Sequence, residues 1–120
     1  MILFDTDICL QLLAGKEKIR QQFGSVLEEV CVAAPCVQEL FLAVEESSNP
    51  EANRRTLDKF LATVRVLYPD AETYRYAARL QKKLAERGSF APVTDVLIYS
   101  LSRIHSARLV TLHARRYRFT

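Results

Sequence analysis

The amino-acid sequence predicts an α/β protein with a short parallel sheet of four to five strands, flanked by helices on both faces. Short apolar runs without polar alternation are typical of parallel strands that are buried on both sides. Longer segments with apolar residues at helical spacing separate these runs, which indicates helical crossovers between parallel strands. The 120 residues are 49% hydrophobic and 26% charged, as in ordinary globular proteins. We therefore expect residues 1–120 to form a single domain.

The expected strands are four short runs of apolar residues, at positions 1–4, 30–34, 64–68 and 108–111. The first run stops abruptly at Asp5, and the second is closed by Pro35. A charged residue is seldom buried in a sheet without a partner, and a proline cannot donate a ladder hydrogen bond. These two residues therefore mark the points at which the chain leaves the sheet.

Two helices are expected between the first and second strands. Thr6 and Asp7 have side chains that can cap a first helix, which would end near Gly15. Residues 16–29 are then expected to form one amphipathic helix, because their apolar side chains recur at helical spacing. These side chains are Ile19, Phe23, Val26 and Leu27.

Two further helices are expected between the second and third strands. Pro35 suits the first turn of the earlier helix, and the polar cluster at residues 47–50 ends it. Within that cluster, Asn49 followed by Pro50 is a signal for the start of the later helix. The apolar face of this helix would carry Leu57, Phe60 and Leu61.

The last crossover again contains two expected helices. Pro69 and Asp70 predict the start of a long helix that ends at Gly88. Thr94 is expected to cap a final helix over residues 95–105, which leads into the fourth strand. In a parallel sheet of this kind, functional residues gather beyond the carboxyl ends of the strands.

The cysteine pattern argues against a disulfide framework and against a structural zinc site. Cys9, Cys31 and Cys36 are odd in number, lack a Cys-x-x-Cys spacing and have only two histidines to assist them. All three lie in apolar surroundings and are interpreted as small core residues. We expect a cytoplasmic protein without a membrane span, because no apolar run reaches about 18 residues and the first residues do not resemble a secretory signal.

The charge is unevenly distributed along the chain. The net charge is +3, and no acidic residue follows Asp95, although five arginines do, at positions 103, 108, 115, 116 and 118. A cationic C-terminal segment suggests an anionic partner, either a nucleic acid or an acidic protein segment. The alternative interpretation is a charged surface that only aids solubility.

Three acidic residues occupy positions that differ from those of acids on solvated helix faces. Asp5 ends the first strand, Glu39 lies in the first turn of the helix after the second strand, and Asp95 opens the last helix. The corresponding ends of parallel strands meet at one edge, so these carboxylates are expected to converge. Converging carboxylates repel one another, and a hard cation such as Mg²⁺ or Mn²⁺ relieves that repulsion. Alternatively, Asp5 caps a helix and the other two acids only stabilise helix N-termini.

Four segments of the chain resemble a known family: residues 2–7 (ILFDTD), 38–40 (QEL), 95–98 (DVLI) and 107–111 (ARLVT). Together and in this order they resemble PIN-domain ribonucleases, most closely the VapC-type toxins of toxin–antitoxin pairs. The resemblance implies a PIN-like fold over the whole chain. It also implies an endoribonuclease that depends on Mg²⁺ or Mn²⁺, with Asp5, Glu39 and Asp95 as metal ligands and catalytic residues.

The resemblance further implies an RNA substrate that is hydrolysed by activated water, a homodimer, and a small cognate antitoxin protein as partner. Members of the family usually carry a fourth acid or an asparagine two residues after the threonine that corresponds to Thr111. Here that residue is His113. Thr111, His113 and the nearby Asp7 are therefore candidate accessory residues. Arg108, Arg115 and Arg116 are candidate contacts to RNA phosphates, because such contacts dominate affinity for nucleic acids.

Two other functions fit parts of the sequence. Residues 4–8 (FDTDI) look like the Asp-x-Asp motif of haloacid-dehalogenase phosphatases, with Asp5 as nucleophile and Asp7 as acid–base. That fold needs further acids after a later strand, which residues 96–120 do not supply. The second alternative is a catalytically weak or inactive PIN-like module that binds RNA or a protein partner, in keeping with His113 at the fourth acidic position.

Overall fold

The computed structural model describes residues 1–119 and contains a sheet in which all neighbouring strands are parallel. The strand order is β3-β2-β1-β4. The bounds are Ile2–Phe4 for β1, Val30–Ala33 for β2, Arg65–Leu67 for β3 and Arg108–Val110 for β4. With helices flanking this sheet, the α/β fold expected from the sequence is confirmed.

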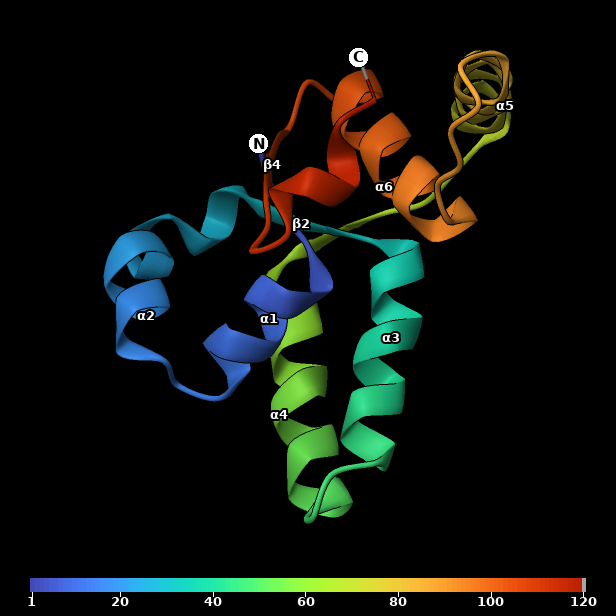
Figure 1. Ribbon diagram of the computed structural model, residues 1–120. Coiled ribbons are helices and arrows are strands. Elements are labelled where there is room, and N and C mark those ends of the chain that lie inside the picture. The colour runs from blue at the N-terminus through green and yellow to red at the C-terminus, as the bar shows by residue number, and fades with distance from the viewer. Residues whose placement is uncertain (120) are drawn as a thin grey trace.

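Helices connect the strands in pairs (Figure 1). Their bounds are α1 Thr6–Leu13, α2 Glu17–Phe23, α3 Ala34–Glu45, α4 Pro50–Thr63, α5 Ala71–Glu86 and α6 Val93–Ile104, with 3₁₀ helices η1 Gly24–Glu29 and η2 Ala114–Tyr117. Figure 1 shows α3 and α4 side by side as a hairpin, with α5 at the opposite periphery of the molecule from α2. Within residues 1–119, no helix is both long enough and apolar enough to cross a membrane.

The position of β1 determines where the functional edge lies. The chain adds β2 and β3 on one side of β1 and then returns to place β4 on the other side. Phe4 pairs with Val32 and with Val110, so Asp5 leaves the sheet between the ends of both neighbouring strands. The Asp5 N–H donates to the Val110 carbonyl over 3.0 Å. Such a reversal of strand order opens a crevice at the carboxyl edge.

Several predicted helix signals are confirmed by the structure. Asn49 caps α4, with its side-chain oxygen accepting a hydrogen bond from the Ala52 N–H. Asp70 and Thr73 form a reciprocal capping box at the start of α5. Gly88 follows the end of α5 with φ +69°, a conformation that glycine adopts without the steric cost of a side chain.

The prediction of one helix over residues 16–29 is wrong. Helix α2 ends at Phe23, and the chain continues as the 3₁₀ helix η1, in which Val26 has non-helical torsions of φ −124° and ψ 23°. The apolar spacing was correctly recognised, but Gly24 and Ser25 interrupt the segment with residues of low helix propensity. A glycine in a helix interior costs about 1 kcal/mol relative to alanine.

The prediction that Thr6 and Asp7 cap the first helix and that Thr94 caps the last one is also wrong, whereas the alternative role of Asp5 as a helix cap is confirmed. Asp5 caps α1 by accepting a hydrogen bond from the Thr6 N–H, whereas Thr6 and Asp7 lie inside the helix. Helix α6 begins at Val93, directly after the extended residue Pro92, so Thr94 lies within its first turn. In both cases the helix begins earlier than the sequence signal suggested, by two residues in α6.

The three cysteines are buried and unpaired, as the sequence predicted. Cys31 lies in β2, while Cys9 and Cys36 lie on α1 and α3 near the end of β1. Burial raises the pKa of all three thiols, and that of Cys36 to about 12. At neutral pH these thiols are therefore protonated, and a protonated thiol is a poor nucleophile.

We expect a thiol-specific aromatic disulfide reagent to label none of the three cysteines rapidly at pH 8 in the native protein. Labelling in a urea series should rise in parallel with the loss of helical circular dichroism. Because the pKa of Cys36 is raised on folding, its contribution to stability is complete below about pH 9 and is lost between about pH 9 and 12. Fast labelling of any thiol without denaturant would contradict the burial described here.

Candidate active site

The carboxylate of Asp5 is buried at the carboxyl edge of the sheet and is surrounded by hydrogen-bond donors. Only 2% of the residue is exposed. Its Oδ1 accepts from the Thr6 N–H at 2.8 Å, and its Oδ2 accepts from the hydroxyls of Thr111 at 2.8 Å and Tyr117 at 2.9 Å. The Cys36 thiol lies 3.9 Å from Oδ1 and adds a weak contact. A buried carboxylate needs such donors to offset the loss of its hydration.

Tyr117 supplies a donor that the sequence did not identify. Burial and the adjacent charge of Asp5 raise the pKa of the Tyr117 hydroxyl above its ordinary range. The hydroxyl therefore stays protonated and donates to the carboxylate at any physiological pH. Tyr117 was overlooked because it lies in η2, after the last strand, where neither periodicity nor a motif marks it.

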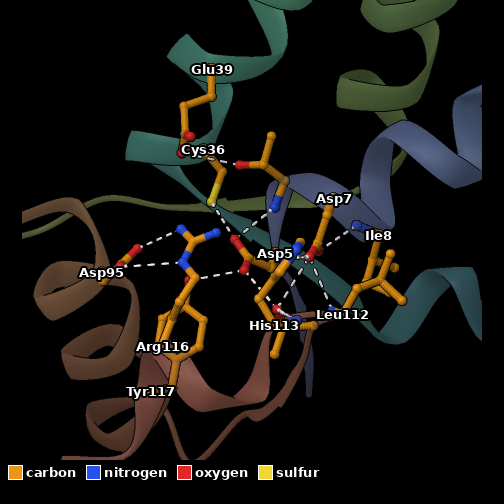
Figure 2. Close-up of polar contacts among 12 residues, drawn as sticks. Asp5, Asp7, Ile8, Cys36, Glu39, Asp95, Leu112, His113, Arg116 and Tyr117 are labelled. Carbon is orange, nitrogen blue, oxygen red and sulfur yellow. Dashed lines mark hydrogen bonds and ion pairs between the residues drawn. The ribbon is translucent and has the colours of Figure 1, made fainter. Parts of the chain in front are cut away.

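Asp95 is also 2% exposed, but its charge is compensated differently. The Arg116 guanidinium donates to both carboxylate oxygens, at 2.7 Å from Nη2 and 3.4 Å from Nε. This hydrogen-bonded pair raises the pKa of Arg116 above its ordinary value. Figure 2 shows the guanidinium between Asp95 and Asp5. Arg116 therefore serves as the local counter-ion for the buried acids of the site.

Asp7 is linked to Asp5 through His113, whose backbone N–H donates to the Thr111 hydroxyl at 3.0 Å, and through Thr111, which donates to Asp5. The Asp7 Oδ2 lies 2.6 Å from His113 Nδ1 and accepts from the Leu112 N–H at 3.0 Å (Figure 2). The Thr111 hydroxyl lies closer to Asp5, at 2.8 Å, than to Asp7, at 3.4 Å, so its single proton is donated to Asp5. His113 is thus held on the outer side of Asp7, with 57% of its side chain exposed.

Glu39 is exposed and lies in the second turn of α3, not in the first turn as the sequence predicted, because the helix begins at Ala34. Its Oε1 accepts a hydrogen bond from the Thr6 hydroxyl at 3.1 Å, and Thr6 is the residue whose N–H binds Asp5. Asp5, Glu39 and Asp95 therefore lie around the same edge of the sheet (Figure 2), but within residues 1–119 they do not converge closely enough to share one ion. Their roles in metal binding and catalysis remain predictions.

The donor set suits a hard divalent cation, because the carboxylates supply the oxygen ligands that Mg²⁺ and Mn²⁺ prefer. In the arrangement described for residues 1–119, however, no three His, Cys, Asp or Glu side chains are close enough to hold one ion together. Arg116 already binds both oxygens of Asp95. The residues therefore fit a divalent cation by the chemistry of their donors, but a cation at Asp95 would have to displace Arg116, and the acids would have to move closer together.

The three candidate RNA-binding arginines lie at different places. Arg115 and Arg116 line a cleft whose wall includes Asp95, together with two further arginines and an exposed aromatic residue. These additional residues are Arg87, Arg118 and Phe90. Arg108 begins β4 and pairs with Ile2, so it lies at the amino edge of the sheet, away from Asp5. Its contact with RNA remains a prediction, but the geometry does not place it in the cleft.

The chain was compared with protein families and with curated proteins. A family model described as PIN domain matches residues 2–119. The tRNA(fMet)-specific endonuclease VapC of Shigella flexneri is 25% identical over 116 residues, which amount to 96% of this chain and 88% of that protein.

Solved structures of similar fold include DNA-bound VapBC from Salmonella typhimurium, with a TM-score of 0.86 and 24% identity over 98% of this chain and 91% of that one. VapBC2 from Rickettsia felis, bound to a DNA fragment from its promoter, gives a TM-score of 0.84 and 23% identity. The match covers 99% of this chain and 95% of that one. At these identities the structures show that the fold is shared.

We expect Arg116→Gln to lower the free energy of unfolding by about 1–3 kcal/mol, because it leaves the buried Asp95 without its charged donor. The variant Arg115→Gln is the matched control, since Arg115 is exposed and forms no ion pair within residues 1–119. The free energy of unfolding of this control variant should differ from that of the wild-type protein by no more than about 0.5 kcal/mol. Urea unfolding followed by circular dichroism measures both, because the chain contains no tryptophan.

A double-mutant cycle with Asp95→Asn isolates the interaction between the two side chains. The decrease in the free energy of unfolding caused by Arg116→Gln should be much smaller in the Asp95→Asn background than in the wild-type background. Equal losses in both backgrounds would show that Arg116 stabilises the protein through other contacts.

Proposed function

Because the chain belongs to the PIN-domain family, we propose that it is a metal-dependent endoribonuclease and the VapC-type toxin of a toxin–antitoxin pair. The supporting observation is the pair of buried carboxylates, Asp5 and Asp95, beside a cleft lined by arginines. Buried acids supply ligands for a cation, while the arginines attract a polyanionic substrate. The similarity to an endonuclease named VapC supports the same reaction class.

We assign Asp5, Glu39 and Asp95 as the ligands of Mg²⁺ or Mn²⁺. When bound, such an ion activates water and neutralises the charge that develops on the phosphate during hydrolysis. The chain's own groups prepare this site. Thr111 and Tyr117 fix the orientation of Asp5, and Asp7 is linked to the same network through Thr111 and His113.

Arg116 has two roles in this proposal. Without a metal, its guanidinium neutralises Asp95. After it releases Asp95, the same side chain lies at the edge of the cleft, where it and Arg115 contact RNA phosphates. One cationic side chain would thereby balance the acidic site when it is empty and bind the substrate when the site is loaded.

The partner proteins follow from the same assignment. The similar structures are described as VapBC complexes, which supports a small cognate antitoxin as the partner of this chain. We further propose that the protein forms a homodimer and acts in the cytoplasm, where RNA is available.

The alternative of a binding module without catalysis has one structural observation in its favour. His113, which stands in place of the family's usual fourth acid, pairs with Asp7. The position of the family's usual fourth acid therefore carries an imidazole and no carboxylate. If the remaining three acids bind metal too weakly, the cleft would still bind RNA or a protein without cleaving it.

Incubation of RNA with the purified, antitoxin-free protein tests the proposal. We expect cleavage with Mg²⁺ or Mn²⁺, none with EDTA, and a loss of about 100-fold or more in Asp5→Asn, because the substitution removes a charged ligand. Asp58→Asn is the matched control, since Asp58 is an exposed acid on α4 and its loss should leave the cleavage rate unchanged.

Circular dichroism spectra establish that each variant is folded before its activity is compared. Absence of cleavage by the folded wild-type protein under every metal would favour the binding module. Cleavage that persists in Asp5→Asn would place the activity elsewhere in the molecule or in a contaminant.

A further inference from the structure

Helix α5 carries a regular series of cations that the sequence analysis did not identify. Arg75, Arg79, Lys83 and Arg87 recur every four residues, over the helix and its C-terminal cap, and all four are exposed. We refer to these residues as the α5 track. Residues four apart in a helix lie one above the other on the same face, with a rise of about 6 Å per step. Because each step also turns by about 40° around the axis, the track presents cations as a stripe that winds gradually around the helix over about 18 Å.

Among the described residues, the α5 track has no acidic partner. Within residues 1–119, no carboxylate lies within ion-pair distance of any of its four residues. The neighbouring Lys82 does pair with Glu86, at 3.9 Å, and for that reason it is not included. Uncompensated cations at a regular spacing on one face are the expected footprint of a polyanion.

The α5 track leads into the candidate active site. Arg79 and Lys83 line a surface depression together with Tyr76, and one turn further along Arg87 lines the same cleft as Asp95. Arg87 is held there by donating from Nη2 to the Phe119 carbonyl at 3.1 Å. The depression and the cleft are thus consecutive features along a single helix, and the second contains the buried acid.

Aromatic side chains accompany the cations along this path. Tyr76 lines the depression, and Phe90, which is 91% exposed, lines the cleft. Single-stranded nucleic acids are recognised by this combination, because phosphates bind cations and bases stack on aromatic faces. An acidic peptide would satisfy the cations but would offer no bases to the aromatic residues.

We propose that the α5 track binds single-stranded RNA and directs it into the cleft at Asp95. The inference extends the proposed nuclease function by naming the surface that holds the substrate outside the reacting centre. Residues of the track contact phosphates away from the scissile bond, so they contribute to binding of the strand.

Binding is measured with fluorescein-labelled single-stranded RNAs of about 4 and about 12 nucleotides, in EDTA, so that no cleavage occurs. We expect the combined substitutions Arg75→Gln, Arg79→Gln and Lys83→Gln to weaken binding of the longer RNA by about tenfold. The slope of log affinity against log salt should fall in magnitude by about 2, which corresponds to three lost contacts at about 0.7 each. Arg87 is left intact because it also binds the Phe119 carbonyl.

The matched control removes the same charge elsewhere, with Lys16→Gln, Arg20→Gln and Lys59→Gln. These residues are exposed, and they lie before or on α2 and on α4, away from α5 (Figure 1). We expect this variant to bind the longer RNA like the wild-type protein. The wild-type protein should also prefer the longer RNA to the shorter one, and the track variant should lose that preference.

Three results would overturn the proposal: equal weakening in the track and control variants, an unchanged affinity in the track variant, or displacement of RNA by an equal charge concentration of poly-glutamate. Cleavage of the short RNA with Mn²⁺ is assayed separately. If the protein cleaves the short RNA but the track substitutions do not change RNA binding, the proposed role of the α5 track is wrong and the nuclease function stands. If the track substitutions weaken RNA binding but the protein cleaves no RNA with any metal, the nuclease function is wrong and the role of the α5 track in RNA binding stands.

Discussion

The burial of a carboxylate at the end of the central strand constrains the whole carboxyl edge of the molecule. Asp5 follows β1, is 2% exposed and cannot be hydrated there, so the fold must bring donors to it. They come from α1, from α3, from the residue after β4 and from η2. Segments more than a hundred residues apart are thereby joined at one group. The C-terminal segment takes its place because Thr111 and Tyr117 both bind Asp5, and this in turn places Arg116 beside Asp95.

The two buried acids are compensated in different ways, and the difference has a functional meaning. Asp5 is held by neutral donors that belong to the framework, so its negative charge is retained within the site. Asp95 is neutralised by a cation whose side chain is 44% exposed and can exchange with solvent or with another cation. A fixed carboxylate beside an exchangeable ion pair suits the proposed metal site, because contacts of the guanidinium with RNA phosphate would offset the cost of removing Arg116 from Asp95.

The sequence was sufficient to predict the fold and the location of the site, because both depend on local signals. Apolar runs indicated the strands, the cap residues Asn49 and Asp70 indicated the starts of α4 and α5, and an acid at the end of a strand indicated Asp5. What it could not predict depends on contacts across the chain. Nothing near Tyr117 or Arg116 indicates that one binds Asp5 and the other Asp95, since each partner lies at least 21 residues away. The helix break at Gly24 was missed because apolar spacing was given more weight than propensity.

A nuclease built on acidic side chains must attract a polyanion to a negatively charged centre. Screening at physiological salt limits the reach of each charge to about 8 Å, so a cationic patch remote from the path of the strand contributes little. The α5 track is about 18 Å long, and the strand must therefore lie directly along it for more than two of its cations to act at once. Arg108, at the amino edge, lies outside such a path, whereas Arg87, Arg115 and Arg116 share a cleft with Asp95. The distribution of the cations thus favours a strand that approaches along α5 and reaches the cleft that contains the buried Asp95.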